Sequence, residues 1–87
     1  MAYKIIVDPR AEKEIDKIDK QIRARIVQFI YKRLAVLDNP RSIGEAMKGE
    51  RFGELWKYRV GDYRLICKIE DDCLVVLVLR VSHRKEV

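Results

Sequence analysis

The residues best suited to chemistry lie in the C-terminal part of the chain, in stretches that have the composition of β-strands. They are Lys57, Arg59 and Arg64 in the segment LWKYRVGDYRL, and His83 and Arg84 in RVSHRKEV. Guanidinium and ammonium groups bind phosphate oxygens, and histidine is the residue type that changes protonation near neutral pH. Together these residue types suit the binding and cleavage of a phosphodiester.

RNA can be cleaved without a metal ion when its 2′-hydroxyl attacks the adjacent phosphate. The reaction needs an acceptor for the hydroxyl proton, cations that stabilise the added negative charge, and a donor for the leaving oxygen. We expect Arg59 and Arg64 to stabilise charge and Lys57 or His83 to accept the proton. Lys57 can do so only where neighbouring cations favour its neutral amine. A solvated basic surface is the competing interpretation.

Alternation along the segment LWKYRV predicts which side chains share a face. The apolar side chains, Trp56, Tyr58 and Val60, alternate with the cations Lys57 and Arg59. We expect the apolar side chains to meet a helical layer, and the two cations to lie on the opposite, open face of the sheet.

Two short turns set the register of the neighbouring strands. Residues 61–62 and 71–72 have the composition of two-residue hairpin turns. With this register Arg59 lies directly opposite Arg64, and counting along the last strand places His83 on the same face. Paired arginines repel each other, so an anion between them relieves the repulsion. The sequence therefore predicts a phosphate site on the open face.

Apolar residues are expected on the same open face. By the same count they are Ile66, Val75, Leu77 and Leu79, with Leu79 opposite Arg64. An exposed apolar patch of this kind usually marks a partner site, here for an amphipathic helix or strand.

Hydrophobic patterns predict the elements that position this site. Residues 3–7 are β-branched and aromatic, which is typical of a strand. Asp8, followed by proline, and Asp19 are good helix N-caps, and apolar spacing continues to about Leu37. Two consecutive helices are therefore expected, and the second ends before Pro40.

The pattern of the C-terminal residues predicts an antiparallel β-meander. Strands are expected at residues 55–60, 63–70 and 73–82, with a short strand near 46–48. The last strand is apolar at nearly every position, which predicts a central strand covered on both faces. The fold class is therefore α+β, with a single domain over residues 1–87 and both helices on one face of the sheet.

The composition of the chain limits the classes of partner that we expect it to bind. The net charge of +5 favours an anionic partner such as nucleic acid. No stretch is apolar enough to span a bilayer and the N-terminus lacks a signal-peptide pattern, so a cytoplasmic protein without a membrane partner is expected. The predicted register places Cys67 and Cys73 on opposite faces of neighbouring strands, so a disulfide between them is not expected. The single histidine and two cysteines lack metal-ligand spacing, so neither a metal nor another cofactor is expected.

These motifs, together with the N-terminal segment MAYKIIVDPRAEKEIDKI and the long second helix, resemble the RelE branch of the RelE/ParE toxin superfamily. The resemblance covers essentially the whole chain and is sharpest in WKYRVGDYRL, the two-carboxylate turn and RVSHRKEV. It implies a RelE-like microbial RNase fold. It also implies a toxin of a type II toxin-antitoxin system that cleaves messenger RNA in the ribosomal decoding site.

The resemblance also implies residue roles. Lys57 and Arg59 match the paired basic positions of the second strand, and Arg64 matches the arginine of the Tyr-Arg-Leu step. Arg84 matches a C-terminal arginine that acts as leaving-group acid or charge stabiliser, and His83 stands where members carry lysine or histidine. Lys57, Arg59, Arg64 and Arg84 are thus the expected RNA-binding residues, and the general base stays open between Lys57 and His83.

One departure concerns the end of the chain. Related chains commonly continue with a tyrosine after a segment like HRKEV, whereas this sequence ends at Val87. Weakened cleavage is the expectation that follows.

Partners follow from the same resemblance. They are a RelB-like antitoxin on the apolar patch, the 70S ribosome with its messenger RNA, and operator DNA bound through the antitoxin. Two alternatives remain: a ParE-like inhibitor of DNA gyrase, and a non-catalytic module that only binds an antitoxin. The full basic set argues against the ParE branch, which generally lacks it.

Overall fold

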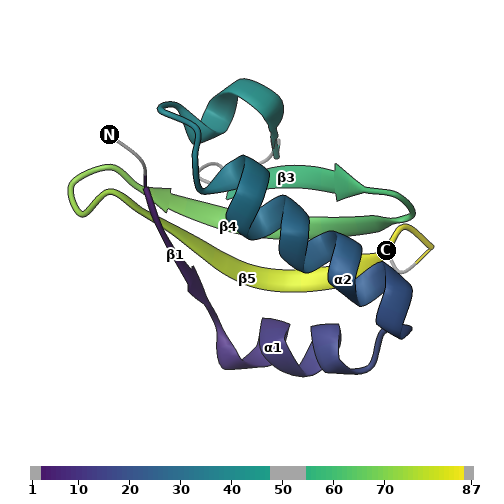
Figure 1. Ribbon diagram of the computed structural model, residues 1–87. Coiled ribbons are helices and arrows are strands. Elements are labelled where there is room, and N and C mark those ends of the chain that lie inside the picture. Colours follow the sequence, from purple (N-terminus) through teal and green to yellow (C-terminus); the bar gives the residue numbers. More distant parts are fainter. Residues whose placement is uncertain (1–2, 48–54, 86–87) are drawn as a thin grey trace.

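The computed structural model of the protein describes residues 3–47 and 55–85. Its centre is a five-stranded sheet in the order β1-β5-β4-β3-β2, with β1 parallel to β5 and the other neighbours antiparallel (Figure 1). The strands are β1 (Lys4–Val7), β2 (Glu45–Ala46), β3 (Leu55–Val60), β4 (Tyr63–Glu70) and β5 (Val75–His83). The α+β fold class expected from the sequence is confirmed.

Two consecutive helices follow β1 and lie on one face of the sheet, with α2 across it and α1 beside β5 (Figure 1). The backbone N–H groups of Arg10 and Gln21 donate to the carboxylates of the caps Asp8 (2.9 Å) and Asp19 (3.2 Å). The helices are α1 (Pro9–Asp16) and α2 (Lys20–Gln28), and α2 continues as the π-helix η1 (Phe29–Leu34). The helical hairpin is therefore confirmed, although the second helix ends three residues earlier than expected.

No helix within residues 3–47 and 55–85 is long and apolar enough to cross a membrane.

The core lies between the helices and the inner face of the sheet. Ile26, Ile30 and Leu34 from the second helical stretch are buried against Tyr58 and Leu65 of the sheet. Trp56 packs against this core from its edge, so the prediction that the apolar side of β3 meets the helices is confirmed.

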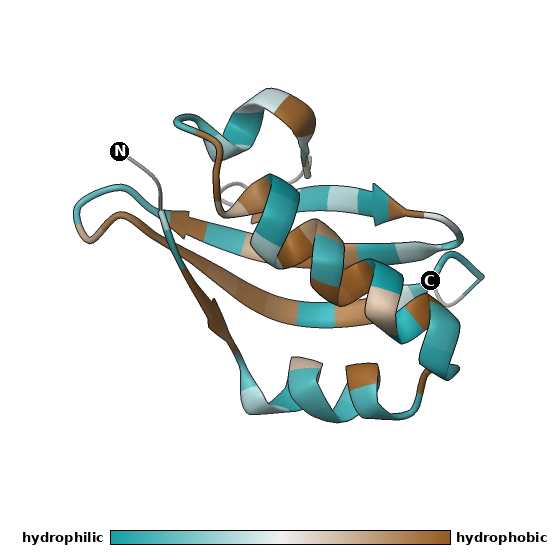
Figure 2. Cartoon of the chain, in the orientation of Figure 1, coloured by the Kyte–Doolittle hydropathy of each residue, from teal (hydrophilic) through white to brown (hydrophobic). Residues whose placement is uncertain are grey.

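β5 is an interior strand, as predicted, with β1 and β4 as its neighbours, and it is coloured hydrophobic along most of its length (Figure 2). Val76 and Val78 are fully buried under the helices. Leu77 and Leu79 are only half-buried. The expectation that this strand is covered on both faces is therefore wrong, because the helices cover one face only.

The hairpin between β3 and β4 has the predicted register. Val60 pairs with Tyr63 and Arg59 pairs with Arg64 across the two-residue turn. Gly61, the first turn residue, has a φ of 59°, a conformation that glycine adopts without steric cost.

The register between β4 and β5 differs from the prediction. Glu70 pairs with Val75, so residues 71–74 form a four-residue connection in place of a two-residue turn. A bulge follows, because Ile66 pairs with Arg80 while the next residue of β4 pairs with Val78, which leaves Leu79 without a partner. These two irregularities shift the end of β5 relative to β4.

The shift changes two predicted neighbours. Arg64 lies opposite Ser82 in place of Leu79, and His83 lies opposite Tyr63. Cys73 sits in the exposed connection and not in a strand, while Cys67 is buried. Both thiols are free in this structure, and the predicted placement of Cys73 within a strand is wrong.

The segment after the helices packs one glycine against the sheet. It contains the 3₁₀ turn η2 (Pro40–Ile43), and the hydroxyl of Tyr58 donates to the carbonyl of Pro40 at 2.6 Å. A β-carbon on Gly44 would lie 2.8 Å from the Tyr58 ring, so only glycine allows this approach. The short strand expected near 46–48 is found at Glu45–Ala46, and residue 48 lies outside the described residues.

Candidate functional site

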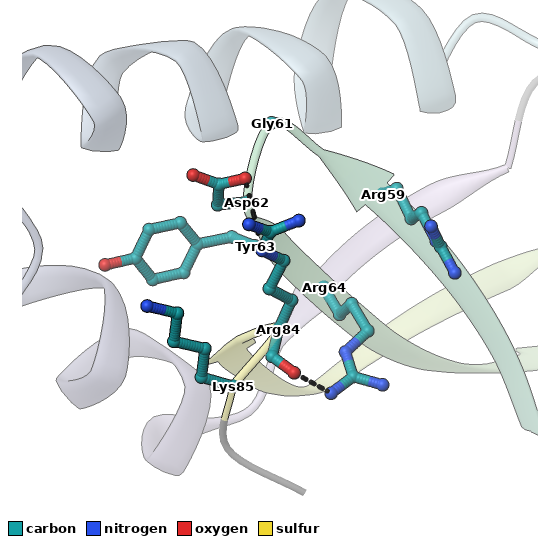
Figure 3. A pocket seen from close by; sticks show the side chains of 7 residues that line it. All are labelled: Arg59, Gly61, Asp62, Tyr63, Arg64, Arg84 and Lys85. Atoms are coloured by element: carbon teal, nitrogen blue, oxygen red, sulfur yellow. Dashed lines mark hydrogen bonds and ion pairs between the residues drawn. The ribbon is translucent and has the colours of Figure 1, made fainter.

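A pocket of about 400 Å³ opens at the β3–β4 turn, where the end of β5 also arrives. Four cationic side chains and one carboxylate line it, so its charge is strongly positive. Figure 3 shows the lining residues, which are Arg59, Gly61, Asp62, Tyr63, Arg64, Arg84 and Lys85. The structure therefore brings together three of the predicted site residues, Arg59, Arg64 and Arg84.

Hydrogen bonds fix the positions of the arginines. Nη2 of Arg64 donates to the carbonyl oxygen of Arg84 at 2.9 Å, which ties β4 to the residue after β5 (Figure 3). The backbone N–H of Arg84 donates to the carbonyl oxygen of Asp62 at 2.7 Å. Its Nε also lies 3.6 Å from the Asp62 carboxylate, in an exposed ion pair. The turn and the end of β5 thus hold each other in place.

Lys57 lies on the same face as Arg59, two residues earlier on β3, and pairs with Ile66 of β4. Its Nζ is 3.6 Å from the carboxylate of Glu45, and its side chain is 22% exposed. Lys57 is therefore held by an acidic neighbour and does not line the arginine pocket. Nothing in the sequence pattern indicated Glu45, because β2 was not given a register there.

His83 lies on the other face of the sheet, so its predicted place on the open face is wrong. Its ring meets the edge of the Tyr63 ring, with centroids 5.2 Å apart, and its Nδ1 accepts from the backbone N–H of Lys85 at 3.2 Å. It faces a separate hollow lined by Glu14 and Lys17 of the first helical stretch. The bulge at Leu79 reverses the alternation on which the prediction rested.

Asp62, Tyr63 and Lys85 line the pocket without having been predicted as site residues. Asp62 was interpreted only as a turn former, although its place between the two arginine-bearing strands was a usable signal. Within residues 3–47 and 55–85, no three His, Cys, Asp or Glu side chains gather as a metal site. The expectation based on Val87 concerns a position outside the described residues.

The predicted apolar residues do lie on the open face. Ile66, Val75, Leu77 and Leu79 are half-buried, and none belongs to the core or packs against it. Ile6 of β1 pairs with Leu77 and is 42% exposed, so it extends the patch. We call these five residues the apolar patch. Ile6 was missed because the pairing of β1 with β5 was not assigned from the sequence.

Two carboxylates anchor the elements that carry the site. The Glu14 carboxylate of α1 accepts hydrogen bonds from the Arg80 guanidinium and from the backbone N–H of Val81 (2.8 Å), directly after the bulge. Partial burial opposes ionisation of Glu14, but the hydrogen bonds from Arg80 and Val81 outweigh it and lower the pKa. In the β4–β5 connection, bidentate hydrogen bonds from Arg41, followed by one from Tyr3, lower the pKa of Asp71.

Comparisons with known proteins agree with this architecture. The model of the family described as "ParE toxin of type II toxin-antitoxin system, parDE" matches residues 5–87. Toxin RelG of Mycobacterium tuberculosis (strain ATCC 25618 / H37Rv) is 30% identical over 87 residues, which cover 100% of this chain and 97% of RelG. The mRNA interferase toxin RelE of Escherichia coli (strain K12) is 32% identical over 85 residues, 98% of this chain and 86% of that protein.

A solved structure extends the likeness to the fold. The toxin-antitoxin complex RelBE2 from Mycobacterium tuberculosis contains a chain that superposes with a TM-score of 0.87 at 28% identity. The match covers 97% of this chain and 100% of that one. The sheet, the helical layer and the strand ends that form the arginine pocket therefore belong to an architecture seen in a solved toxin-antitoxin complex.

Proposed function

This chain belongs to the RelE branch of the RelE/ParE superfamily of type II toxin-antitoxin toxins, and on that premise we propose that it is an endoribonuclease. It cleaves messenger RNA in the decoding site of the 70S ribosome, in the cytoplasm, and so inhibits translation. The observation that carries the proposal is the pairing of Arg59 with Arg64 beside Arg84 in an open pocket. Such a cluster is stabilised when an anion lies within it.

In the proposed reaction the 2′-oxygen attacks the adjacent phosphorus, and the bond from phosphorus to the 5′-oxygen breaks. The products are a 2′,3′-cyclic phosphate and a free 5′-hydroxyl. The 2′-hydroxyl proton passes to an acceptor, and the leaving 5′-oxygen gains a proton, so no further reactant is needed. Arg59 and Arg64 stabilise the charge on the phosphorane oxygens, and Arg84 stabilises or protonates the leaving oxygen.

Neither of the two candidate proton acceptors, Lys57 and His83, lines the arginine pocket. Lys57 forms an ion pair with Glu45 on the neighbouring strand β2, and His83 lies on the opposite face of the sheet. The pocket is thus rich in charge-stabilising groups and poor in acid–base groups. We infer that correct placement of the substrate by the ribosome supplies much of the rate, because orientation of the attacking oxygen lowers the barrier independently of proton transfer.

The test is to map messenger 5′ ends after addition of the purified chain to translating ribosomes. Cuts within the decoding-site codon are expected, with cleavage by Arg64→Ala slower by about 100-fold, the usual effect of losing one charge-stabilising group. Lys68→Ala, which removes a cation from the same strand outside the pocket, is the matched control and keeps its activity. Intact messenger with the unaltered chain contradicts the proposal.

We also propose that a cognate RelB-like antitoxin binds the apolar patch. The solved relatives include toxin-antitoxin complexes, and the patch offers half-buried aliphatic side chains that the core does not use. An amphipathic helix or strand suits such a surface. In this proposal the complex binds its own operator DNA through the antitoxin. Antitoxin binding without any RNA cleavage is the result expected of a purely binding module.

Inhibition of DNA gyrase is the second candidate, because the matching family model is described as a ParE toxin. The arginine pocket favours the nuclease. A supercoiling assay with purified gyrase separates the two: inhibition of supercoiling by the chain, together with uncut messenger RNA, favours the gyrase activity.

A further inference from the structure

A second basic groove lies on the helical side of the sheet, next to the arginine pocket. It has a volume of about 450 Å³ and runs between the second helical stretch and the end of β3. Its cations are Arg25, Lys32, Arg33 and Arg59, and no acidic residue lines it. We call it the helix groove. Its floor includes the half-buried Phe29 and Ile43.

The helix groove and the arginine pocket form one path. Arg59 and Gly61 line both of them. Arg25 reaches the turn itself, since a β-carbon on Gly61 would lie 3.4 Å from its Nη1. Figure 3 shows Gly61 at the top of the pocket, on the side where a helix passes. A ligand leaving the arginine pocket over this turn therefore enters the helix groove.

No carboxylate among the described residues compensates the charge of this groove. Elsewhere in the described ranges, cations such as Arg41, Lys57 and Arg80 are paired with carboxylates. The four cations of the helix groove form no ion pair with any residue of 3–47 or 55–85. Residues 20–34 contain five cations and no acidic residue, whereas α1 mixes both signs. Like charges gathered without counterions are stabilised by an anionic ligand.

The spacing of the cations fits a chain of anions better than a single phosphate. Arg25 and Lys32 are seven residues apart, about 10 Å along a helix axis. A polynucleotide carries a charge at every nucleotide, and the ring of Phe29 offers an apolar surface for a base or sugar. An acidic polypeptide matches the charge but does not explain the continuity with a pocket suited to phosphodiester cleavage.

We propose that the helix groove is a second RNA-binding site, which holds RNA backbone beyond the scissile phosphate. The inference rests on the proposed function for its choice of RNA as ligand. The backbone comes either from the continuation of the cleaved strand or from ribosomal RNA beside it. Both sources present the same phosphodiester chemistry to the groove.

The test compares two variants that each lose three positive charges. The groove variant is Arg25→Gln/Lys32→Gln/Arg33→Gln, and the control variant is Arg10→Gln/Lys13→Gln/Lys17→Gln on and beside α1. The replaced side chains are exposed in both variants, so both variants should fold. Circular dichroism checks this. If the groove variant does not fold, Lys32→Gln/Arg33→Gln is compared with Lys13→Gln/Lys17→Gln.

The first measurement is binding of 2′-O-methyl oligonucleotides, which cannot be cleaved, by fluorescence anisotropy at several salt concentrations. The groove variant should bind an oligonucleotide of about ten residues at least tenfold more weakly than the control variant, with a salt slope lower by about two. An oligonucleotide of about three residues, which fills the arginine pocket alone, should bind both variants equally. This pattern identifies the continuation of the cleaved strand as the occupant.

The second measurement is cosedimentation of each variant with 70S ribosomes. Weaker cosedimentation of the groove variant, with unchanged oligonucleotide binding, identifies ribosomal RNA. Equal behaviour of the two variants in both measurements overturns the proposal. Binding of poly-glutamate to each variant is measured as well, and a groove variant that loses only this binding also overturns the proposal. Neither measurement requires cleavage. If the chain binds RNA through the helix groove but does not cleave messenger RNA, the proposed nuclease function is refuted and the proposed second RNA-binding site is retained.

Discussion

At the scale of single residues, the most informative feature is the pairing of two arginines. Arg59 and Arg64 lie directly opposite each other, although cross-strand pairs of like charge are destabilising. This pairing was predictable because a two-residue turn fixes the register of the hairpin that follows it. The third arginine, Arg84, was expected near this site from its place at the end of the last strand and from family resemblance, and the hydrogen bond from Arg64 to its carbonyl oxygen holds it there.

His83 gives a prediction that follows from its place on the helical side of the sheet. We expect His83→Phe to keep the ring contact with Tyr63 and to retain cleavage within about threefold, because the imidazole does not reach the pocket. A general acid or base contributes at least about 100-fold, so the single-turnover rate of messenger cleavage distinguishes the two roles. A loss of that size in His83→Phe, with normal thermal unfolding, would restore a proton-transfer role for His83.

At the scale of elements, the helices and the first hairpin were predictable and the second hairpin was not. Asp8 and Asp19 cap their helices through local hydrogen bonds that depend only on nearby sequence. The β4–β5 connection depends on distant partners: Tyr3 and Arg41 bind Asp71. The local sequence pattern favoured a two-residue turn, because contacts with residues distant in the sequence cannot be inferred from it.

The bulge has a similar origin. A run of apolar residues in β5 satisfies either face of the sheet, so alternation alone cannot reveal that Leu79 is an extra residue. The contact that marks the bulge comes from another element, because Glu14 of α1 receives the Arg80 guanidinium and the Val81 N–H. Placing His83 correctly from the sequence required knowledge of that tertiary contact.

These anchors predict how stability depends on pH. The pKa values of Glu14 and Asp71 are lowered in the folded chain from their ordinary values of 4.5 and 3.8. Groups with lowered pKa values stabilise the fold fully above those ordinary values, and the contribution is lost as the pH falls below them. We therefore expect the urea midpoint to be level near neutral pH and to fall progressively below about pH 4.5.

Substitution of one anchor tests the cause. Glu14→Gln should lower the free energy of unfolding at pH 7 by about 1–2 kcal/mol, the usual cost of losing hydrogen bonds to a charged group at a partly exposed position. It should also show a shallower decrease in acid than the unaltered chain. Glu12→Gln on the exposed side of α1 is the control. Parallel pH profiles for Glu14→Gln and the unaltered chain would contradict the assignment.

At the scale of the whole molecule, the two faces of the sheet divide the proposed tasks. The open face carries the arginine pocket at one end and the apolar patch beside it. The helical side carries the core and, along its edge, the helix groove. The net charge of +5 is not spread evenly, because the cations of the helix groove and of the arginine pocket gather around the β3–β4 turn, whereas Arg41–Asp71 and Lys68–Glu70 ion pairs lie toward the other end of the sheet. An antitoxin on the open face would cover the patch and approach the pocket from its side.

That arrangement leads to a prediction about neutralisation. Ile66→Ser/Leu77→Ser should weaken binding of the cognate antitoxin by about 10- to 100-fold, because central aliphatic contacts carry much of the affinity of an interface. The fold should remain, since neither side chain belongs to the core. Val36→Ser is the control, because Val36 is an apolar side chain that is 64% exposed and lies outside the sheet. Calorimetric titration of each folded variant with antitoxin measures the effect. Unchanged affinity in the double variant would place the antitoxin on another surface, and the helix groove is then the first to examine, because its uncompensated cations offer an acidic segment a binding site of their own.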